Sequence, residues 1–128
     1  MNHFAVIGLI GVTQEPPYYI VSEFMPKENL FKCLHSNIPP TPTQRTIIAL
    51  GVAIGLSYMH RNNYIYRDIK SLNILLDADE YPKICDFGIS RFVPQSRDLM
   101  TGGVGTAQWE APEVINNEPY TEKADVYS

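Results

Sequence analysis

The chain has 128 residues, the length of one modest domain, and its 45% hydrophobic and 19% charged residues give a globular rather than a disordered composition. The formal net charge is −4 and no run rich in lysine and arginine occurs, which argues against a nucleic-acid or anionic-membrane surface. The apolar run at residues 4–12 is too short for a membrane span of about 20 residues, and two cysteines without metal-type spacing favour a reduced, intracellular setting.

The first elements in chain order are two predicted strands and a short helix. Residues 4–12 are rich in valine, isoleucine and leucine, which predicts a buried strand. The turn signal QEPP follows at 14–17, and residues 18–25 form a second run of aromatic and β-branched residues. We therefore expect an antiparallel hairpin, followed by a short helix over residues 28–35.

The next element is a long helix with a well-marked start. Thr41 is a suitable N-cap, Pro42 suits the first helical position, and Gln44 completes a capping box three residues after Thr41. Apolar residues then cover more than one helical face: Ile47, Leu50, Ile54 and Tyr58 on one, and Ile48, Val52 and Leu56 on another. This pattern predicts a buried helix that ends at residues 60–63.

Three short strand-like pieces follow the helix, at residues 64–66, 73–76 and 82–85. The sequence DADE at 77–80 is typical of a turn between the last two. These pieces predict a second, small β region directly after the long helix.

The last third of the chain has little periodicity. Residues 88–109 contain many glycine, threonine and serine residues and predict a long exposed loop. APEVINN at 111–117 predicts one or two helical turns, and EKADVYS at 122–128 is typical of the start of another helix.

Four polar residues in the region of short strands suggest chemistry. Taken singly, Asp68 beside an arginine is usually part of a solvated ion pair, and Asn73 at a strand edge is usually a turn residue. Together, Asn73 and Asp86 offer the oxygen ligands that Mg²⁺ prefers alongside substrate phosphates. Asp68 can then orient a hydroxyl and accept its proton, while Lys70 neutralises charge on a phosphoryl group. This set of groups suits phosphoryl transfer.

Three motifs give this constellation a family resemblance. YRDIKSLN at 66–73 resembles the catalytic loop of protein kinases, with tyrosine and isoleucine in place of the usual histidine and leucine. DFG at 86–88 matches the magnesium-binding motif of that family, and APE at 111–113 closes the activation segment. SEFM at 22–25 resembles the hinge and DVYS at 125–128 the start of the central helix of the large lobe. The style of these motifs is most similar to the tyrosine-kinase-like group of serine/threonine kinases.

The resemblance implies catalytic and metal-binding roles residue by residue. Asp68 resembles the catalytic base, and Lys70 is similar to the lysine that serine/threonine kinases place two residues after it. Asn73 and Asp86 resemble the two magnesium ligands. Thr106, in GTAQW, resembles the threonine that contacts the base and the substrate.

The resemblance also implies an ATP site. Glu23 and Met25 would meet adenine through their backbone, with Ser22 as a small gatekeeper and Leu75 packed beneath the base. The alternative for Ser22 and Leu75 is ordinary core packing.

Regulatory residues follow from the same resemblance. Arg67 resembles the arginine that often binds an activation-loop phosphate in this family. The alternative is that Arg67 pairs with nearby carboxylates or carbonyls. Tyr66 takes the position that packs under Phe87, which with Gly88 completes the regulatory DFG motif. The candidate phosphate acceptors are Ser90, Ser96 and Thr101.

We therefore expect an α+β, protein-kinase-like fold. Residues 1–25 would form the end of the small lobe and the hinge, and residues 26–128 the large lobe through the activation segment. The implied function is a cytoplasmic protein serine/threonine kinase that uses ATP, Mg²⁺ and a protein substrate. The alternative is a non-enzymatic kinase-like or truncated module that binds protein partners.

The glycine-rich loop and the V-A-I-K lysine of kinases do not occur in these 128 residues. We therefore expect the isolated chain to have little or no kinase activity and to fold weakly, with apolar faces exposed.

Overall fold

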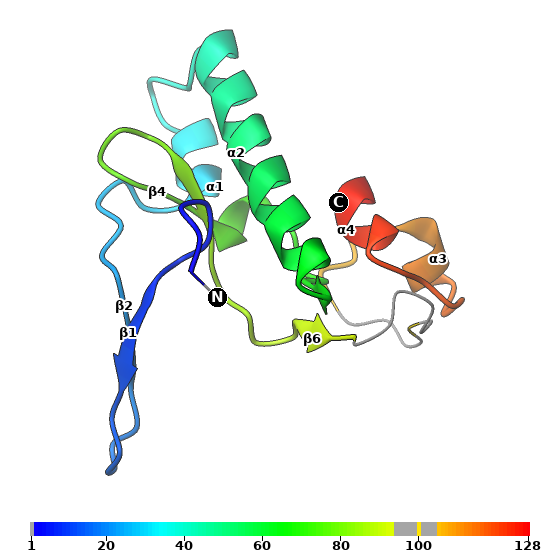
Figure 1. The fold of residues 1–128 in the computed structure, drawn as a ribbon. Helices are drawn as coiled ribbons and strands as arrows, with labels where there is room; N and C mark the ends of the chain where they lie inside the picture. Colours follow the sequence, from blue (N-terminus) through cyan, green and yellow to red (C-terminus); the bar gives the residue numbers. More distant parts are fainter. Residues whose placement is uncertain (1, 94–99, 101–104) are drawn as a thin grey trace.

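The computed structural model describes residues 2–93, 100 and 105–128. Its elements, in chain order, are β1 (Leu9–Val12), β2 (Ile20–Ser22), α1 (Leu30–Leu34), α2 (Pro42–Arg61), β3 (Tyr64–Ile65), the 3₁₀ turn η1 (Ser71–Asn73), β4 (Ile74–Leu76), β5 (Pro82–Ile84), β6 (Arg91–Phe92), α3 (Pro112–Ile115) and α4 (Lys123–Tyr127). Figure 1 shows the hairpin of β1 and β2 projecting at one end of the molecule, α2 running through its centre, and α3 and α4 on the other side. No helix in the described ranges is long and apolar enough to cross a membrane.

The predicted hairpin is confirmed, but both of its strands are shorter than the expected 4–12 and 18–25. β1 pairs with β2 in antiparallel register, and both strands are largely exposed. The buried part of the predicted strand is instead Ala5 and Val6, which lie beside β5: Ile84 N donates to Ala5 O and Ile7 N donates to Ile84 O. The apolar run therefore divides between two neighbours, which is why one continuous buried strand is wrong.

The start and end of α2 match the prediction. The Thr41 hydroxyl accepts from Gln44 N, and the Gln44 side chain accepts from Thr41 N, so the capping box is present. The expectation of burial on several sides is wrong. One face packs inward, while Ile47 and Leu50 on the other are 41% and 60% exposed, because no described element covers them. α1 likewise begins later than expected, with Asn29 as its N-cap.

Two hydrophobic clusters hold the molecule together. The first joins α2 to the antiparallel pair β4–β5 and consists of Val6, Leu56, Met59, Tyr66, Ile69, Ile74 and Ile84. The second lies under α3 and α4 and consists of Ile65, Val93, Met100, Ala111, Val114, Tyr120 and Ala124. The two clusters meet at the segment that leaves β3, because Ile65 belongs to one and Tyr66 to the other.

The region predicted as a long exposed loop contains ordered structure. β6 pairs with β3, and the side chains of Val93 and Met100 are buried. Met100 and Tyr120 exchange two backbone hydrogen bonds of 2.9 Å. Each of these pairings joins only a few residues that are far apart in the chain, so it produces no periodic pattern in the sequence. Asn73, predicted as the start of a strand, ends η1 instead.

Candidate active site

The carboxylate of Asp68 is the centre of the site. It lies on the segment between β3 and η1, and three side chains donate hydrogen bonds to it. Lys70 Nζ donates to Oδ2 at 2.7 Å, Asn73 Nδ2 donates to the same oxygen at 2.8 Å, and the Thr106 hydroxyl donates to Oδ1 at 2.8 Å. Lys70 Nζ also donates to the Thr106 hydroxyl at 2.8 Å. Residues that are 38 positions apart in the chain therefore meet around one carboxylate.

These contacts favour the ionised form of Asp68. Burial by itself raises the pKa of the carboxyl group, but the hydrogen bonds from Lys70, Thr106 and Asn73 outweigh it and leave the pKa below its ordinary value of 3.8. Asp68 is consequently ionised at neutral pH. An ionised, fixed carboxylate can orient a hydroxyl group and accept its proton.

Asn73 and Asp86 lie on adjacent segments joined by backbone contacts. Asn73 is buried, and its Nδ2 also donates to the carbonyl of Asp68 at 3.0 Å. Cys85 N donates to Asn73 O at 3.0 Å, which fixes β5 and its extension against η1. Asp86 follows directly, is exposed, and adopts a left-handed backbone conformation with φ of 58°. An amide oxygen and a carboxylate are hard donors of the kind that Mg²⁺ takes from proteins, so this pair fits that ion.

Tyr66 holds the DFG motif from beneath. Its ring contacts that of Phe87 edge-to-face, with centroids 5.7 Å apart, as predicted for this position. Its hydroxyl donates to the carbonyl of Cys85. Burial, with smaller effects from Cys85, Asp86 and Asp68, raises the pKa of the Tyr66 hydroxyl. Tyr66 therefore stays protonated and remains a donor.

Asp125 on α4 supports the segment of residues 66–68, and the sequence motifs do not reveal this role. It is 2% exposed, and its two oxygens accept from Tyr66 N at 2.9 Å and from Arg67 N at 2.7 Å. His60 at the end of α2 contacts the same carboxylate at 2.8 Å. The motif DVYS at 125–128 indicates the start of a helix, but an acidic residue at a helix start does not by itself reveal a buried partner.

The predicted regulatory residues fall partly within the described structure. Arg67 has φ of 72°, and its Nε donates to the carbonyl of Ile89 at 2.6 Å, which is the carbonyl pairing that the sequence left open. The Ser90 hydroxyl donates to the carbonyl of Phe87 at 2.8 Å. Gly88 N contacts Asp86 Oδ1 at 3.2 Å. Ser96 and Thr101 lie outside the described residues.

The predicted nucleotide-binding residues lie where the hairpin joins the rest of the molecule. Met25 is buried and Leu75 is half-buried in β4, whereas Ser22 is exposed at the end of β2. The carboxylate of Glu23 forms an ion pair with Lys83 of β5. That pairing was not predicted.

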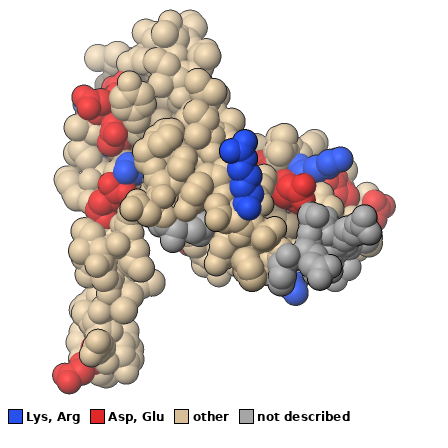
Figure 2. Space-filling model, viewed as in Figure 1, with Lys and Arg blue, Asp and Glu red and all other residues tan. Residues whose placement is uncertain are grey.

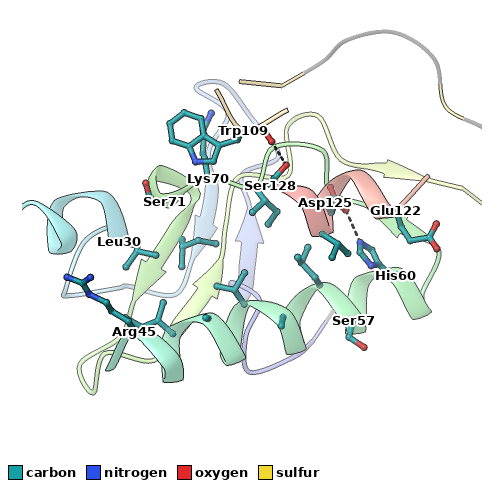
Figure 3. A pocket seen from close by; sticks show the side chains of 18 of the residues that line it. Leu30, Arg45, Ser57, His60, Lys70, Ser71, Trp109, Glu122, Asp125 and Ser128 are labelled. Carbon is teal, nitrogen blue, oxygen red and sulfur yellow. Dashed lines mark hydrogen bonds and ion pairs between the residues drawn. The ribbon is translucent and has the colours of Figure 1, made fainter. Parts of the chain in front are cut away.

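A large hollow lies beside the segment that contains Ile69, Lys70 and Ser71. It has a volume of about 900 Å³ between α1, α2 and α4, and Asp68, Asn73 and Asp86 do not line it. Figure 3 shows Lys70 and Trp109 at one end of this hollow and the contact of His60 with Asp125 at its side. Figure 2 shows a largely uncharged surface on one face, on which side chains of both signs, Lys and Arg as well as Asp and Glu, are scattered.

Comparison with known proteins agrees with the motifs and the geometry. The chain is 41% identical over 131 residues to serine/threonine-protein kinase STY46 of Arabidopsis thaliana. It is 40% identical over 129 residues to mitogen-activated protein kinase kinase kinase 12 of Rattus norvegicus. Each alignment covers 100% of this chain, but only 22% and 14% of the respective relative. The chain thus spans about a fifth or less of the length of these two proteins.

The family itself is established by a match over the full sequence. The model of the protein kinase domain matches residues 1–128. The expected α+β kinase fold and the resemblance of the motifs are confirmed by this match. The chain belongs to the protein kinase domain family.

Proposed function

We propose that the protein carrying this chain transfers the γ-phosphoryl group of ATP to serine or threonine hydroxyls of protein substrates. The observation that carries the proposal is the Asp68 carboxylate, ionised and held by Lys70, Thr106 and Asn73. The names of the relatives, which are serine/threonine-protein kinases, support the same choice. From its motifs we place the protein in the tyrosine-kinase-like group of these kinases. Lys70 and Thr106 are the residues that favour serine and threonine over tyrosine as acceptors.

In this mechanism Asp68 orients the acceptor hydroxyl and takes its proton as the oxygen attacks the γ-phosphorus. The bond from the γ-phosphorus to its bridging oxygen breaks, and ADP leaves with that oxygen. Lys70, already within 2.7 Å of Asp68, lies where it can neutralise charge on the transferred group. Asn73 and Asp86 would hold Mg²⁺, which when bound neutralises phosphate charge.

The backbone of Glu23 and Met25 would bind adenine, with Leu75 beneath it and Ser22 behind it. Residues 1–25 would then be the end of the small lobe with the hinge, and residues 26–128 the large lobe. Phosphorylation in the activation segment, at Ser90, Ser96 or Thr101, would bring a phosphate to Arg67. We place the enzyme in the cytoplasm.

The test is phosphoryl transfer by the longest natural form of the protein that contains residues 1–128. With Mg-ATP and a generic protein substrate, we expect Asp68→Asn to lower kcat by at least about 100-fold, because the proton acceptor and its charge are lost. Phosphoamino-acid analysis of the product is expected to give phosphoserine or phosphothreonine.

The matched control is Asp79→Asn, which makes the same chemical change in the exposed turn between β4 and β5. Transfer that is equally strong in wild type and Asp68→Asn would refute the proposal. Nucleotide binding without any transfer by the wild type would favour the alternative, a kinase-like module that binds partners.

A further inference from the structure

Glu23 and Lys83 form an ion pair between two parts of the proposed nucleotide site. Lys83 Nζ lies 2.8 Å from both Oε1 and Oε2 of Glu23. The Lys83 side chain is 17% exposed and that of Glu23 is 34% exposed, so the pair is shielded from water more than ordinary surface pairs. The hydrogen bond from Lys83 is the main reason why the pKa of Glu23 lies below its ordinary value.

A third group completes the arrangement. Gly8 N donates to Glu23 Oε1 at 2.6 Å, and Glu23 N donates to the carbonyl of Gly8 at 3.0 Å. A side chain at position 8 would be crowded, because a Cβ atom there would lie 3.1 Å from Oε1. Glu23 is therefore held at its backbone by the hairpin and at its carboxylate by both the hairpin and β5.

The ion pair connects two segments that we propose contribute to the nucleotide site. Glu23 directly follows β2, in the stretch whose backbone we propose binds adenine. Lys83 is the middle residue of β5, three residues before Asp86. The distance between the backbone of residues 23–25, proposed to bind adenine, and Asp86, proposed to bind the metal, thus depends on how the hinge packs against β5. The ion pair spans that junction directly.

We propose that Lys83 is a positioning residue that holds the hinge against β5 and so preorganises the nucleotide site. The effect on nucleotide binding rests on the proposed function. The restraint of the hinge by the ion pair does not. Without the pair, the hinge must become ordered when nucleotide binds, and this ordering weakens affinity.

Hydrogen exchange tests the restraint without any nucleotide. In the longest natural form of the protein, Lys83→Met is expected to speed amide exchange over residues 22–25. Lys83→Arg, which keeps a two-pronged pairing with the carboxylate, is expected to retain wild-type exchange. The matched control is Lys32→Met, which removes the ion pair between Lys32 of α1 and Glu28, whose side chains are 60% and 61% exposed. Unchanged exchange over residues 22–25 in Lys83→Met overturns the proposal, even if the protein is not a kinase.

Nucleotide binding tests the consequence. Isothermal titration with Mg-ADP should give a dissociation constant that is about two- to fivefold higher for Lys83→Met, the range expected for a partly exposed ion pair. The KM for ATP should rise to the same extent with a smaller change in kcat, and Lys83→Arg should restore both. Faster exchange with unchanged or tighter nucleotide binding would overturn the preorganising role. If wild type binds no nucleotide, the proposed function fails and the exchange data decide on the restraint.

Discussion

At the scale of single residues, Tyr66 shows how one side chain can do two tasks at a catalytic segment. Its ring supports Phe87 from below, and its hydroxyl binds the carbonyl of Cys85, which precedes Asp86. Cys85 is affected in turn: burial and the neighbouring Asp86 raise the pKa of its thiol to about 11. The backbone next to the proposed metal ligand is thus held by a phenol that stays protonated at physiological pH.

The two tasks of Tyr66 can be separated by substitution. Tyr66→Phe keeps the ring contact but leaves the Cys85 carbonyl without its donor, so we expect the free energy of unfolding to fall by about 1 kcal/mol. Tyr66→Ala also removes a fully buried ring and should lower it by about 3–5 kcal/mol. Urea denaturation measures both. Equal losses in the two variants would mean that the ring contributes nothing beyond its hydroxyl.

At the scale of elements, the segment of residues 66–68, which carries the proposed base Asp68, depends on a helix that lies nearly 60 residues further along the chain. α4 brings the Asp125 carboxylate to the backbone N–H groups of Tyr66 and Arg67. This contact holds Arg67 in the left-handed region, with φ of 72°, where a residue with a side chain is strained. The turn directs the next residue, Asp68, towards Lys70 and Thr106.

Asp125→Asn tests this support. The two N–H groups bind different oxygens of the carboxylate, and an amide offers only one oxygen, so its NH₂ group would face a donor. We expect the free energy of unfolding to fall by about 2–3 kcal/mol, since a buried donor loses a charged acceptor.

Thermal and urea denaturation give the magnitude, and amide exchange at residues 66–68 reports where the loss occurs. Val126→Asn, at an exposed position on the same helix, is the control and should change stability little. A small effect of Asp125→Asn with unchanged exchange at these amides would contradict the supporting role.

The elements differ in how far the sequence predicts them. The capping box of Thr41 and Gln44 gave the start of α2, because a cap is a local interaction. The proposed base Asp68 and the proposed metal ligands Asn73 and Asp86 could be named because their motifs fix several neighbouring positions at once. Contacts between distant segments could not be predicted, because no local sequence pattern indicates them. They are the pairing of β3 with β6, the Met100–Tyr120 contact and the Glu23–Lys83 ion pair.

At the scale of the whole molecule, α2 is the element against which the rest is arranged. Its buried face contacts β5 and the segment at Ala5, and its C-terminal end brings His60 to Asp125. Gly51 and Gly55 lie on that face, one helical turn apart, where β5 approaches the helix most closely.

Alanine at either glycine should therefore destabilise the protein, although alanine favours a helix over glycine by about 1 kcal/mol. A Cβ atom at position 51 would lie 2.4 Å from Pro82 Cγ, and one at position 55 would lie 2.9 Å from the carbonyl oxygen of Ala5. Overpacking of this kind costs about 1–3 kcal/mol and exceeds the helical gain where the neighbour is backbone or a rigid ring.

We expect Gly55→Ala to lower the free energy of unfolding, measured by urea denaturation, by up to about 2 kcal/mol. Ser57→Ala, at an exposed position of the same helix, should raise it by about 0.5 kcal/mol, and a comparable rise in Gly55→Ala would mean that α2 is not pressed against β5.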